Sequence, residues 1–468
     1  MSILDYDYAG DTYDSLADGY DGVASPPPIP PLPPPLYPNP YSSPFKYVFY
    51  DFLTGAFLGQ LPIAGASWSQ TLNAAGQFSG TINMADPRVQ LLDPQTLTEP
   101  GRTAMFIDYN GSLVWGGWTL TARPFTRSTR ILNYTASELW SYFGRRIQAT
   151  AYDAPPFSGI TGPSTPMSIW GAAYTGTYPA ETGWDPLLIA TQVISDALGY
   201  ATNGVPILNG NPVGGMQLML NGTSLSADAP TAYLASGTGT PSANYISVNY
   251  PYASFQKVDQ IVSQLAGLGY TVGFDFGIDV AYSNGPGSQP IATINFNYPR
   301  RGRTFAQNGV TVQVGGSARD YTVTPDASTC ANTLYETGGQ SAVVISQNTH
   351  PLDQGYALLE DTVSRSQILS SNVISILTEL GIGDLYLTSY PATTFSVKMP
   401  LFGNDPQYGQ FIVGDDCRLM IDPDEFFPNG LDGEWRITAN TIDLPDQGDA
   451  TMTLTLSPPP VYPTGAYI

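Results

Sequence analysis

The block from Tyr47 to Ile147 alternates apolar and polar side chains over several short runs, as the strands of a small antiparallel barrel do. Met105 falls on one face of such a run and Asp108 on the other. Asn110-Gly111 follows directly, and this dipeptide best tolerates the positive φ angles of a type I′ hairpin turn. A looser version of the pattern recurs toward the C-terminal end. The sequence therefore predicts a mainly β protein with an antiparallel barrel in each half of the chain.

Short helical patterns interrupt these strands. Ser137 is the predicted N-cap of a helix that ends at Gly144. Asp185-Pro186 supplies an N-cap and a proline at the first helical position, and Ser254 is the predicted N-cap of a further helix. We also expect a strand at residues 270–276 and helical segments around residues 356–365 and 372–380.

Charged residues make up 12% of the 468 residues, about half the usual share, and Thr, Ser, Asn, Gln, Gly and Tyr replace them. Extended β surfaces that pack against other subunits have this composition, because a buried charge loses its hydration. An extracellular β protein with a polar, uncharged surface is the alternative. The net charge of −22 argues against a nucleic-acid-binding groove, since such grooves neutralise phosphates with Lys and Arg.

The two cysteines, Cys330 and Cys417, lie too far apart in the sequence to suggest a disulfide framework. Cys417 alternates with Leu419, which predicts a buried thiol. The N-terminus lacks the basic and apolar regions of a signal peptide. No apolar run approaches the roughly 18 residues of a membrane span. We therefore expect synthesis in a cytoplasm and no membrane span.

Residues 1–44 are expected to form an N-terminal arm. The first part is acidic, contains no Lys or Arg, and carries Tyr6, Tyr8, Tyr13 and Tyr20 among its aspartates. Such a segment cannot fold alone, so its tyrosines either anchor it to a partner or belong to a solvated tail. Residues 26–40 are proline-rich and predict a polyproline II strap that extends about 3.1 Å per residue.

Residues for catalysis are scarce. His350 is the only histidine, which excludes a metal site with two histidine ligands. A nucleophilic pair of Cys330 and His350 lacks a helix N-terminus or a strained turn around the cysteine. Ser254 and Lys257 match the S-x-x-K pattern of penicillin-recognising enzymes, but the accompanying S-D-N and K-T-G elements are absent. Ser254 as a helix cap and Lys257 as a solvent-facing residue explain the match.

A second group of candidates consists of carboxylates near the C-terminal end: Asp422, Asp424, Glu425, Asp432 and Glu434. Their spacing does not follow the calcium loop of an EF-hand. A solvated hairpin loop is expected, with a calcium site as the alternative. No helix or strand presents two acids convincingly for glycoside cleavage. We therefore expect no catalytic site, no metal and no cofactor, and the chain is not predicted to be an enzyme.

Several segments carry a resemblance to a known family. They read FYDFLTGAFLGQLP, SWSQTLNAAGQFSGTINM, MFIDYNGSLVWGGWTLTARPF, LNYTASELWSYFGRRI, YTVTPDASTCANTLYETG and FIVGDDCRLMI. In this order and spacing they resemble the tail-hub, or baseplate-hub, minor tail proteins of long-tailed siphophages that infect actinobacteria. The resemblance covers most of residues 45–458.

The resemblance implies a fold of two tube-like antiparallel β-barrels with α+β insertions. After the arm of residues 1–44, the first barrel would span residues 45–147. A peripheral α+β insertion region would follow at residues 148–320. The second barrel, with a helical insertion, would span residues 321–458, and residues 459–468 would form an extended tail.

The resemblance also implies a structural role at the tail tip. Three copies would form a ring that joins the six-fold tail tube to the three-fold tip and surrounds a channel for DNA. The implied partners are the distal tail protein or tail tube above, the tape-measure protein in the lumen, and other minor tail or tip proteins below. The protein would be assembled in the host bacterial cytoplasm and reside in the virion. A receptor-binding or cell-wall-binding tail protein and a tail-associated cell-wall hydrolase are the alternatives.

Arginine dominates the few basic residues, and it suits the planar, multi-donor contacts of subunit interfaces better than lysine does. The residues expected at interfaces are Arg123, Arg127, Arg130, Arg145 and Arg146, together with the four tyrosines of the arm. Arg300, Arg301 and Arg303 form a second cluster, for which an anion site is the alternative. On the wall of a channel, acidic residues are expected to outnumber arginines, because a polyanion slides past a neutral or negative wall.

Overall fold

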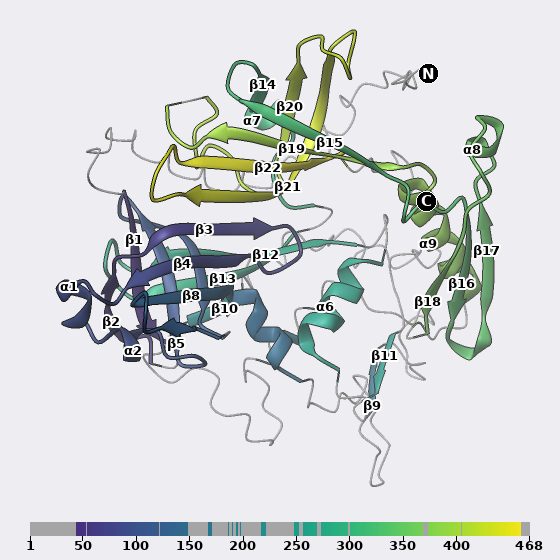
Figure 1. The fold of residues 1–468 in the computed structure, drawn as a ribbon. Coiled ribbons are helices and arrows are strands. Elements are labelled where there is room, and N and C mark those ends of the chain that lie inside the picture. Colours follow the sequence, from purple (N-terminus) through teal and green to yellow (C-terminus); the bar gives the residue numbers. More distant parts are fainter. Residues whose placement is uncertain are drawn as a thin grey trace, which may run out of the picture. The chain divides into compact units, whose positions relative to one another are not determined.

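The computed structural model describes residues 44–147 and 256–459, with short gaps at 53, 121, 269–272, 298–299, 367, 369–372 and 404. Between these two ranges it describes only short stretches and single positions within residues 167–251. The described chain is mainly antiparallel β with few helices, as the sequence predicts (Figure 1). The four tyrosines of the arm and Ser254 lie outside the described residues.

The strands of the N-terminal half follow the predicted alternation. They are β1 (Phe45–Asp51), β2 (Phe57–Leu61), β3 (Ala64–Thr71), β4 (Gln77–Asn83), β5 (Thr103–Tyr109), β6 (Ser112–Trp118), β7 (Phe125–Thr126) and β8 (Ile131–Glu138). Two short helices, α1 (Pro87–Gln90) and α2 (Pro94–Leu97), separate β4 from β5. The hairpin between β5 and β6 turns at Asn110 and Gly111, whose φ angles are 51° and 87°, which confirms the predicted turn.

The middle region contributes β9 (Met167–Trp170), β10 (Gln217–Leu220), β11 (Val248–Pro251), α6 (Val258–Ala266), β12 (Asp275–Tyr282) and β13 (Pro290–Asn297). β10, β13 and β12 form a small sheet, and β11 pairs with β9. The apolar positions of α6 that face the core are Val258, Ile261, Val262 and Leu265.

The C-terminal half begins with α7 (Phe305–Asn308), β14 (Thr311–Val314) and β15 (Asp320–Asp326). It ends with β19 (Ala392–Pro400), β20 (Asp416–Ile421), β21 (Leu431–Leu444) and β22 (Thr451–Ser457). Between β15 and β19 lies a small sheet of β16 (Thr333–Gly338), β17 (Val343–Gln347) and β18 (Glu360–Arg365), with the turns η5 (Gly339–Ser341) and α8 (His350–Asp353). The helix α9 (Val373–Thr388) packs against β16 and β17.

One sheet of 14 strands runs through both halves, in the order β15-β19-β22-β21-β3-β4-β8-β6-β5-β1-β2 with β7, β14 and β20 as branches. The halves meet where β21 pairs antiparallel with β3, from Ala439 opposite Thr71 to Leu444 opposite Ala66. Figure 1 shows this junction, with β21 beside β3. The strand path ends at β15 and β2, and its closure into two separate barrels stays a prediction, as do the domain boundaries.

The length of β21 makes this junction possible. Arg436 pairs with Asp416 of β20 and with Ser457 of β22, so β20 and β22 occupy opposite edges of β21. Further along, Thr441 pairs with Thr453 of β22 and with Ser69 of β3. One edge of β21 therefore serves β20 first and β3 next, which joins the two halves through backbone hydrogen bonds.

Two large apolar cores use opposite faces of the N-terminal strands. Phe49, Met105 and Ile107 belong to a core that continues into the C-terminal half. Their neighbours Tyr50 and Phe106 point the other way, into a core shared with α6, β12 and β13. Because both faces of these strands are covered, β5 is buried along its whole length.

Four local predictions are corrected by the structure. Ser137 lies in β8 instead of capping a helix, and the turn that follows is a 3₁₀ helix, η3 (Leu139–Arg145), that continues through Gly144. α6 begins at Val258 with Lys257 in the N-cap position, which places its start after Ser254. The predicted strand at residues 270–276 is β12, which begins at Asp275. Residues 360–365 form the strand β18 instead of a helix, because they pair in parallel with β16.

Candidate functional surface

The sheet that joins the two halves has one polar face, built from seven neighbouring strands: β15, β19, β22, β21, β3, β4 and β8. Each strand places Ser, Thr, Asn or Gln at alternate positions. In β22, for example, Thr453 and Thr455 alternate with Met452, Leu454 and Leu456, which are fully buried. We call the outward-facing side chains of these seven strands the polar face.

The register of the strands aligns these polar side chains in rows across the junction between the halves. One row runs through Asp320, Lys398, Thr453, Thr441 and Ser69. The next row runs through Thr451, Asp443, Ser67, Ser79 and Thr135. Strands drawn from distant parts of the sequence thus build one continuous surface.

The opposite side of the same strands is apolar and buried. Phe395, Leu454, Ile442, Trp68, Phe78 and Tyr134 point inward from successive strands, and each is at most 1% exposed. Half-buried antiparallel strands alternate in this way. A one-residue slip of any strand would bury hydroxyls and expose aromatic rings, so the register of the polar face is strongly fixed.

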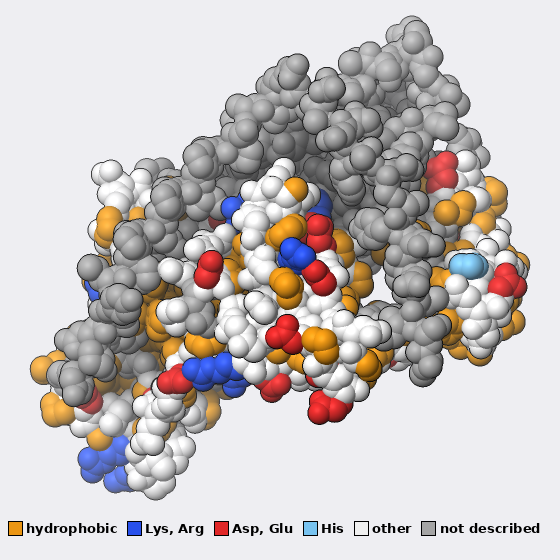
Figure 2. All heavy atoms as spheres, turned by 90° about the horizontal axis from the view of Figure 1, so that it is seen from above, with side chains coloured by type: hydrophobic (Ala, Val, Ile, Leu, Met, Phe, Trp, Pro, Cys, Tyr) orange, Lys and Arg blue, Asp and Glu red, His pale blue; other side chains and the backbone are white. Residues whose placement is uncertain are grey.

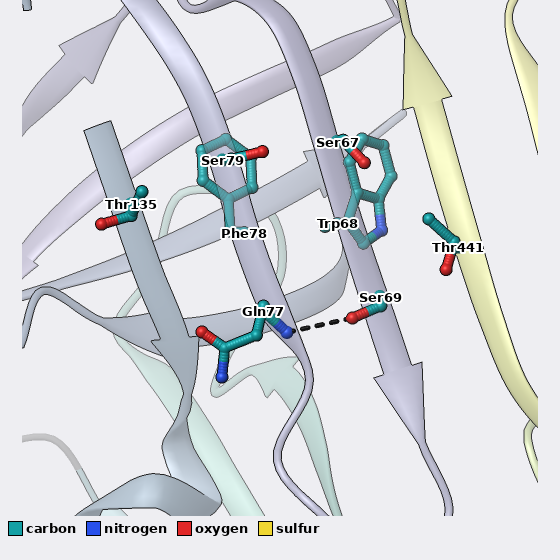
Figure 3. A pocket seen from close by; sticks show the side chains of 8 residues that line it. All are labelled: Ser67, Trp68, Ser69, Gln77, Phe78, Ser79, Thr135 and Thr441. Atoms are coloured by element: carbon teal, nitrogen blue, oxygen red, sulfur yellow. Dashed lines mark hydrogen bonds between the residues drawn. The ribbon is translucent and has the colours of Figure 1, made fainter. Parts of the chain in front are cut away.

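A shallow, open hollow of about 400 Å³ lies on the polar face where β21, β3, β4 and β8 meet (Figure 3). Ser67, Ser69, Gln77, Ser79, Thr135 and Thr441 contribute its polar lining. The backbone N–H of Gln77 donates to Ser69 Oγ at 3.1 Å, and Ser67 Oγ donates to a carboxylate oxygen of Asp443 at 2.6 Å. The hollow offers hydroxyl and amide groups, and Asp443 is a charge at its margin.

Charge is sparse on the polar face. Lys398 is a cation at an exposed outward position, and Asp320, Asp326, Asp432, Glu434 and Asp443 are acids at outward positions. Figure 2 shows the same character on another view of the molecule, where the charged side chains of described residues are separate spots among hydrophobic and uncharged surface. Such a face has little to attract a phosphate backbone.

The five candidate interface arginines of the first half fall into two places. Arg127 and Arg130 are exposed in the turn between β7 and β8. Arg123 precedes β7 and is half-buried, because its Nη1 donates to Gln95 O at 2.7 Å and to Thr98 Oγ1 at 2.6 Å. Their role at subunit interfaces stays a prediction.

Arg145 and Arg146 lie at the end of η3, away from that turn in the sequence. Arg145 is exposed. Arg146 Nη2 donates to Ala197 O at 2.8 Å, and its guanidinium lies 5.6 Å from the centre of the Tyr142 ring. Arg146 therefore ties the end of the first half to the middle region.

Arg300, Arg301 and Arg303 are bound by carboxylates of the same chain. Arg300 makes two short hydrogen bonds to Asp416, with Nη1 at 2.8 Å and Nη2 at 2.6 Å. Arg303 Nη2 lies 2.6 Å from Asp415 Oδ2, and Arg301 pairs with Asp279. Since buried aspartates satisfy two of these arginines, the cluster fixes the middle region to β20 and offers no free anion site.

A buried acidic centre lies beside these ion pairs. Asp275 accepts hydrogen bonds from Asn73 Nδ2 at 2.8 Å, from Arg301 N at 2.7 Å and from Arg436. Asp275 begins β12, Asn73 follows β3, and Arg436 lies in β21. One carboxylate therefore connects the middle region to both halves.

Glu138 is a second buried acid, at the end of β8. One carboxylate oxygen accepts from the N–H of Gly76 at 2.8 Å. Burial raises its pKa to about 7, although that hydrogen bond and the nearby Arg301 oppose the shift. Glu336 repeats the situation in β16, where burial raises its pKa to about 7 against the attraction of Arg365.

Of the residues considered for catalysis, the structure describes Cys330, His350 and Lys257, and it also describes Cys417. Cys417 is fully buried, as predicted, and burial raises the pKa of its thiol to about 12. Burial also raises the pKa of the Cys330 thiol, which disfavours the nucleophilic thiolate. His350 is exposed at the start of α8, and its Nε2 lies 3.1 Å from Gln354 Nε2. Lys257 is exposed, as predicted.

The C-terminal acids are engaged in local hydrogen bonds. Asp424 accepts from the N–H groups of Phe426 and Phe427 and from the hydroxyl of Tyr321. Asp432 lies in β21 and binds Arg418, with Nε at 2.6 Å. In the part of the chain that is described, no three His, Cys, Asp or Glu side chains are grouped to hold a metal ion. None of the described helices has the length and apolar character to cross a membrane.

The sequence did not predict that the polar side chains of the two halves form one surface. The alternation in each strand is visible in the sequence, most clearly in TMTLTLS. The pairing of β21 with β3 is not, because these strands are separated by more than 300 residues and no local pattern records their partner. Only that pairing brings the polar rows of the two halves together.

Comparisons with known proteins give one likeness that supports the fold. No protein-family model and no curated protein sequence matches the chain. A tail protein from Neisseria meningitidis MC58 has 10% sequence identity and a TM-score of 0.50, over 89% of this chain and 98% of that one.

Two further solved structures have lower TM-scores. Prophage tail protein gp18 from Listeria monocytogenes EGD-e has 12% identity, with a TM-score of 0.44 over 89% and 95% of the two chains. The 43 kDa tail protein of prophage MuSo2 from Shewanella oneidensis has 11% identity, with a TM-score of 0.47 over 88% and 98%. The likeness to the Neisseria tail protein shows that the chain shares its fold.

Proposed function

We propose that this chain is a structural subunit of a bacteriophage tail, in which three copies form a hub ring around the tail channel. The polar face carries the proposal: two halves of one chain contribute side by side to a single sheet whose outward surface is hydroxyl-rich and nearly uncharged. The shared fold of the Neisseria tail protein supports it. Three copies with two halves each would offer six similar units to a six-fold tube.

In this proposal the polar face lines the channel. DNA slides past a wall that does not bind phosphates, and five acids accompany the one lysine of this face. The hydroxyl groups of this face remain hydrated and carry no charge that would attract the DNA. Arg300 and Arg303 are satisfied by aspartates of the same chain, so they do not act as phosphate contacts.

The chain would act by assembly and not by catalysis. Its partners would be the tail tube or distal tail protein on one side, tip proteins on the other, and the tape-measure protein within the lumen. The tail tip of the virion would be its location. Receptor binding is not favoured by the hollow on the polar face, because that hollow is shallow and lies on the surface proposed to face the channel.

The mass and shape of the purified assembly test this function. Sedimentation or native mass spectrometry should give three copies, and electron microscopy should show a ring with a central hole. A chain that stays monomeric at every concentration, or that forms a six-copy ring, contradicts the trimeric hub. Hydrolysis of purified cell wall by the protein would instead support the hydrolase alternative.

A further inference from the structure

The polar face has two lateral margins of opposite character. One margin is β15, for which β19 is the pairing partner among the described strands of this sheet. The other margin is the β7–β8 hairpin. Near Ser137, β8 pairs with β6, whereas near Ile131 it pairs with β7. From β15 to β7 every pairing is antiparallel, and the strands number eight. Because eight is an even number, β7 and β15 of one copy run in opposite directions. If β7 of one copy paired with β15 of the next, the two strands would therefore be antiparallel.

The free edge of β15 is identified by two residues. Pro325 has no N–H, and a strand proline is tolerated where that position faces away from the paired strand. The N–H of Tyr321 donates to its neighbouring Asp320 side chain at 2.9 Å. Residues 321, 323 and 325 therefore direct their backbone away from β19. Their carbonyls and the N–H of Val323 are the groups that a further strand would use.

This edge is acidic. Asp320 and Asp326 are exposed at its two ends. The hydroxyl of Tyr321 donates to Asp424. Burial, with smaller contributions from Asp424, Glu425 and Asp320, raises the pKa of that tyrosine to about 12. The nearest cations are Arg319, which is paired with Asp449 at 2.7 Å, and Lys398, which stands opposite Asp320 in the register.

The β7–β8 hairpin is basic. Arg127 and Arg130 are exposed, and neither makes an ion pair with the rest of the chain as far as the structure describes it. Phe125 is 52% exposed, although it stands opposite the buried Leu132 and therefore on the apolar side of the sheet. The hairpin thus ends the sheet with an uncovered aromatic ring and two unpaired cations.

We infer that the β7–β8 hairpin of one copy pairs with β15 of the next copy. This inference rests on the proposed ring, and it names the two edges that close it. Such an interface is head-to-tail, so repeating it generates a closed ring if the rotation closes. Arg127 and Arg130 would lie at the Asp320 end of β15, and this charge complementarity selects the partner edge.

This pairing between copies would extend both the apolar side and the polar side of the sheet. Tyr321 and Val323 are half-buried on the apolar side of β15, where Phe125 of the neighbouring copy would cover them. Thr126 stands opposite Ile131, on the other side of β7 from Phe125, and would continue the hydroxyl rows of β15. The polar face of one copy would then run into that of the next without an exposed strand edge.

Charge reversal tests this pairing in the full chain. The hairpin variant carries Arg127→Glu and Arg130→Glu, and the strand variant carries Asp320→Lys. Each alone should lower the yield of the assembled ring at least tenfold, because like charges then face each other. A chain with all three substitutions should recover most of the ring, since every interface is complementary again.

Lys257→Glu is the matched control, because Lys257 is exposed but lies at the start of α6. It should assemble like the unchanged chain. Circular dichroism and thermal unfolding verify that each variant folds. The pairing of these edges is wrong if the hairpin and strand variants assemble normally. It is also wrong if the chain that combines their substitutions forms no rings while the hairpin and strand variants both remain folded.

A disulfide gives an independent measurement. Thr126→Cys and Thr322→Cys in a Cys330→Ser background should form covalent trimers on mild oxidation, whereas Thr126→Cys with Thr453→Cys should not, because Thr453 lies in the middle of the sheet. Rings that form without this cross-link refute the edge pairing but leave the proposed function standing. An unchanged chain that never forms rings refutes the proposed function itself.

Discussion

At the scale of single residues, this chain buries acidic side chains, although its surface carries few charges. Glu138 is 8% exposed and accepts a hydrogen bond from Gly76 N–H, and burial raises its pKa to about 7. In the unfolded chain the same carboxyl ionises near its ordinary value. Between these two pH values the folded state holds a proton that the unfolded state has lost, so stability falls as pH rises.

Replacing Glu138 with Gln should remove this pH dependence, because the amide oxygen still accepts from Gly76 and carries no charge. The variant should match the unchanged chain near pH 4.5 and exceed it by about 3 kcal/mol above pH 7, from a shift of some 2.5 pH units. Urea unfolding at a series of pH values measures this. Glu425→Gln, at an exposed position, is the control and should change neither curve. Equal stability differences at pH 4.5 and pH 8 would contradict the assignment.

At the scale of elements, the contact between the β13–α7 connection and the loop before β20 holds the middle region to the C-terminal half. Gly302 has a φ of 91°, and a Cβ there would lie 2.2 Å from the backbone carbon of Gly414. This close approach places Arg300 and Arg303 on either side, within reach of Asp416 and Asp415. Only glycine satisfies both the backbone angle and the space.

Gly302→Ala should therefore destabilise the protein by more than the roughly 1–3 kcal/mol that a strained backbone angle costs by itself. Gly355→Ala is the matched control, because Gly355 has a φ of 89° and open space around its Cβ position. The difference between the two variants in urea unfolding isolates the steric part. Equal losses would show that the approach of Gly302 to Gly414 does not restrict the structure.

At the scale of the whole molecule, residues 38–468 form one compact unit. Both barrels of the prediction lie in this unit, and its cores are built from residues 45–456. The arm would serve neighbouring subunits of the tail, where a phage context favours a polyproline strap over a ligand of SH3-like domains.

Deleting residues 1–43 should leave the melting temperature of the remaining chain unchanged within error, because the cores formed by the described residues begin at Phe45. It should also reduce incorporation of the protein into tail tips. Differential scanning calorimetry measures the first effect, and quantification of the protein in purified particles measures the second. Unfolding of the truncated chain would contradict a role of the arm outside the fold, and normal incorporation would contradict the strap.

The sequence by itself determined the strands and their faces. Alternation of apolar and polar residues marks β4, β5 and β22, and Asn110-Gly111 marks the hairpin between β5 and β6, because side-chain period and turn chemistry are local properties. Helix limits were less well determined. Residues 360–365 resemble a helix in isolation, and their parallel pairing with β16 makes them a strand.

Only the tertiary structure decided which strands are neighbours and which charges are satisfied. The pairing of β21 with β3 depends on backbone hydrogen bonds between distant segments, which every residue type can form, so no residue identity announces it. The arginines at 300, 301 and 303 show the same limit. Their aspartate partners lie up to 116 residues away, and a cluster that looks free in the sequence is neutralised in the fold. Arg127 and Arg130 stay exposed because their hairpin ends the sheet, and that position in the topology is what gives these two residues their proposed role.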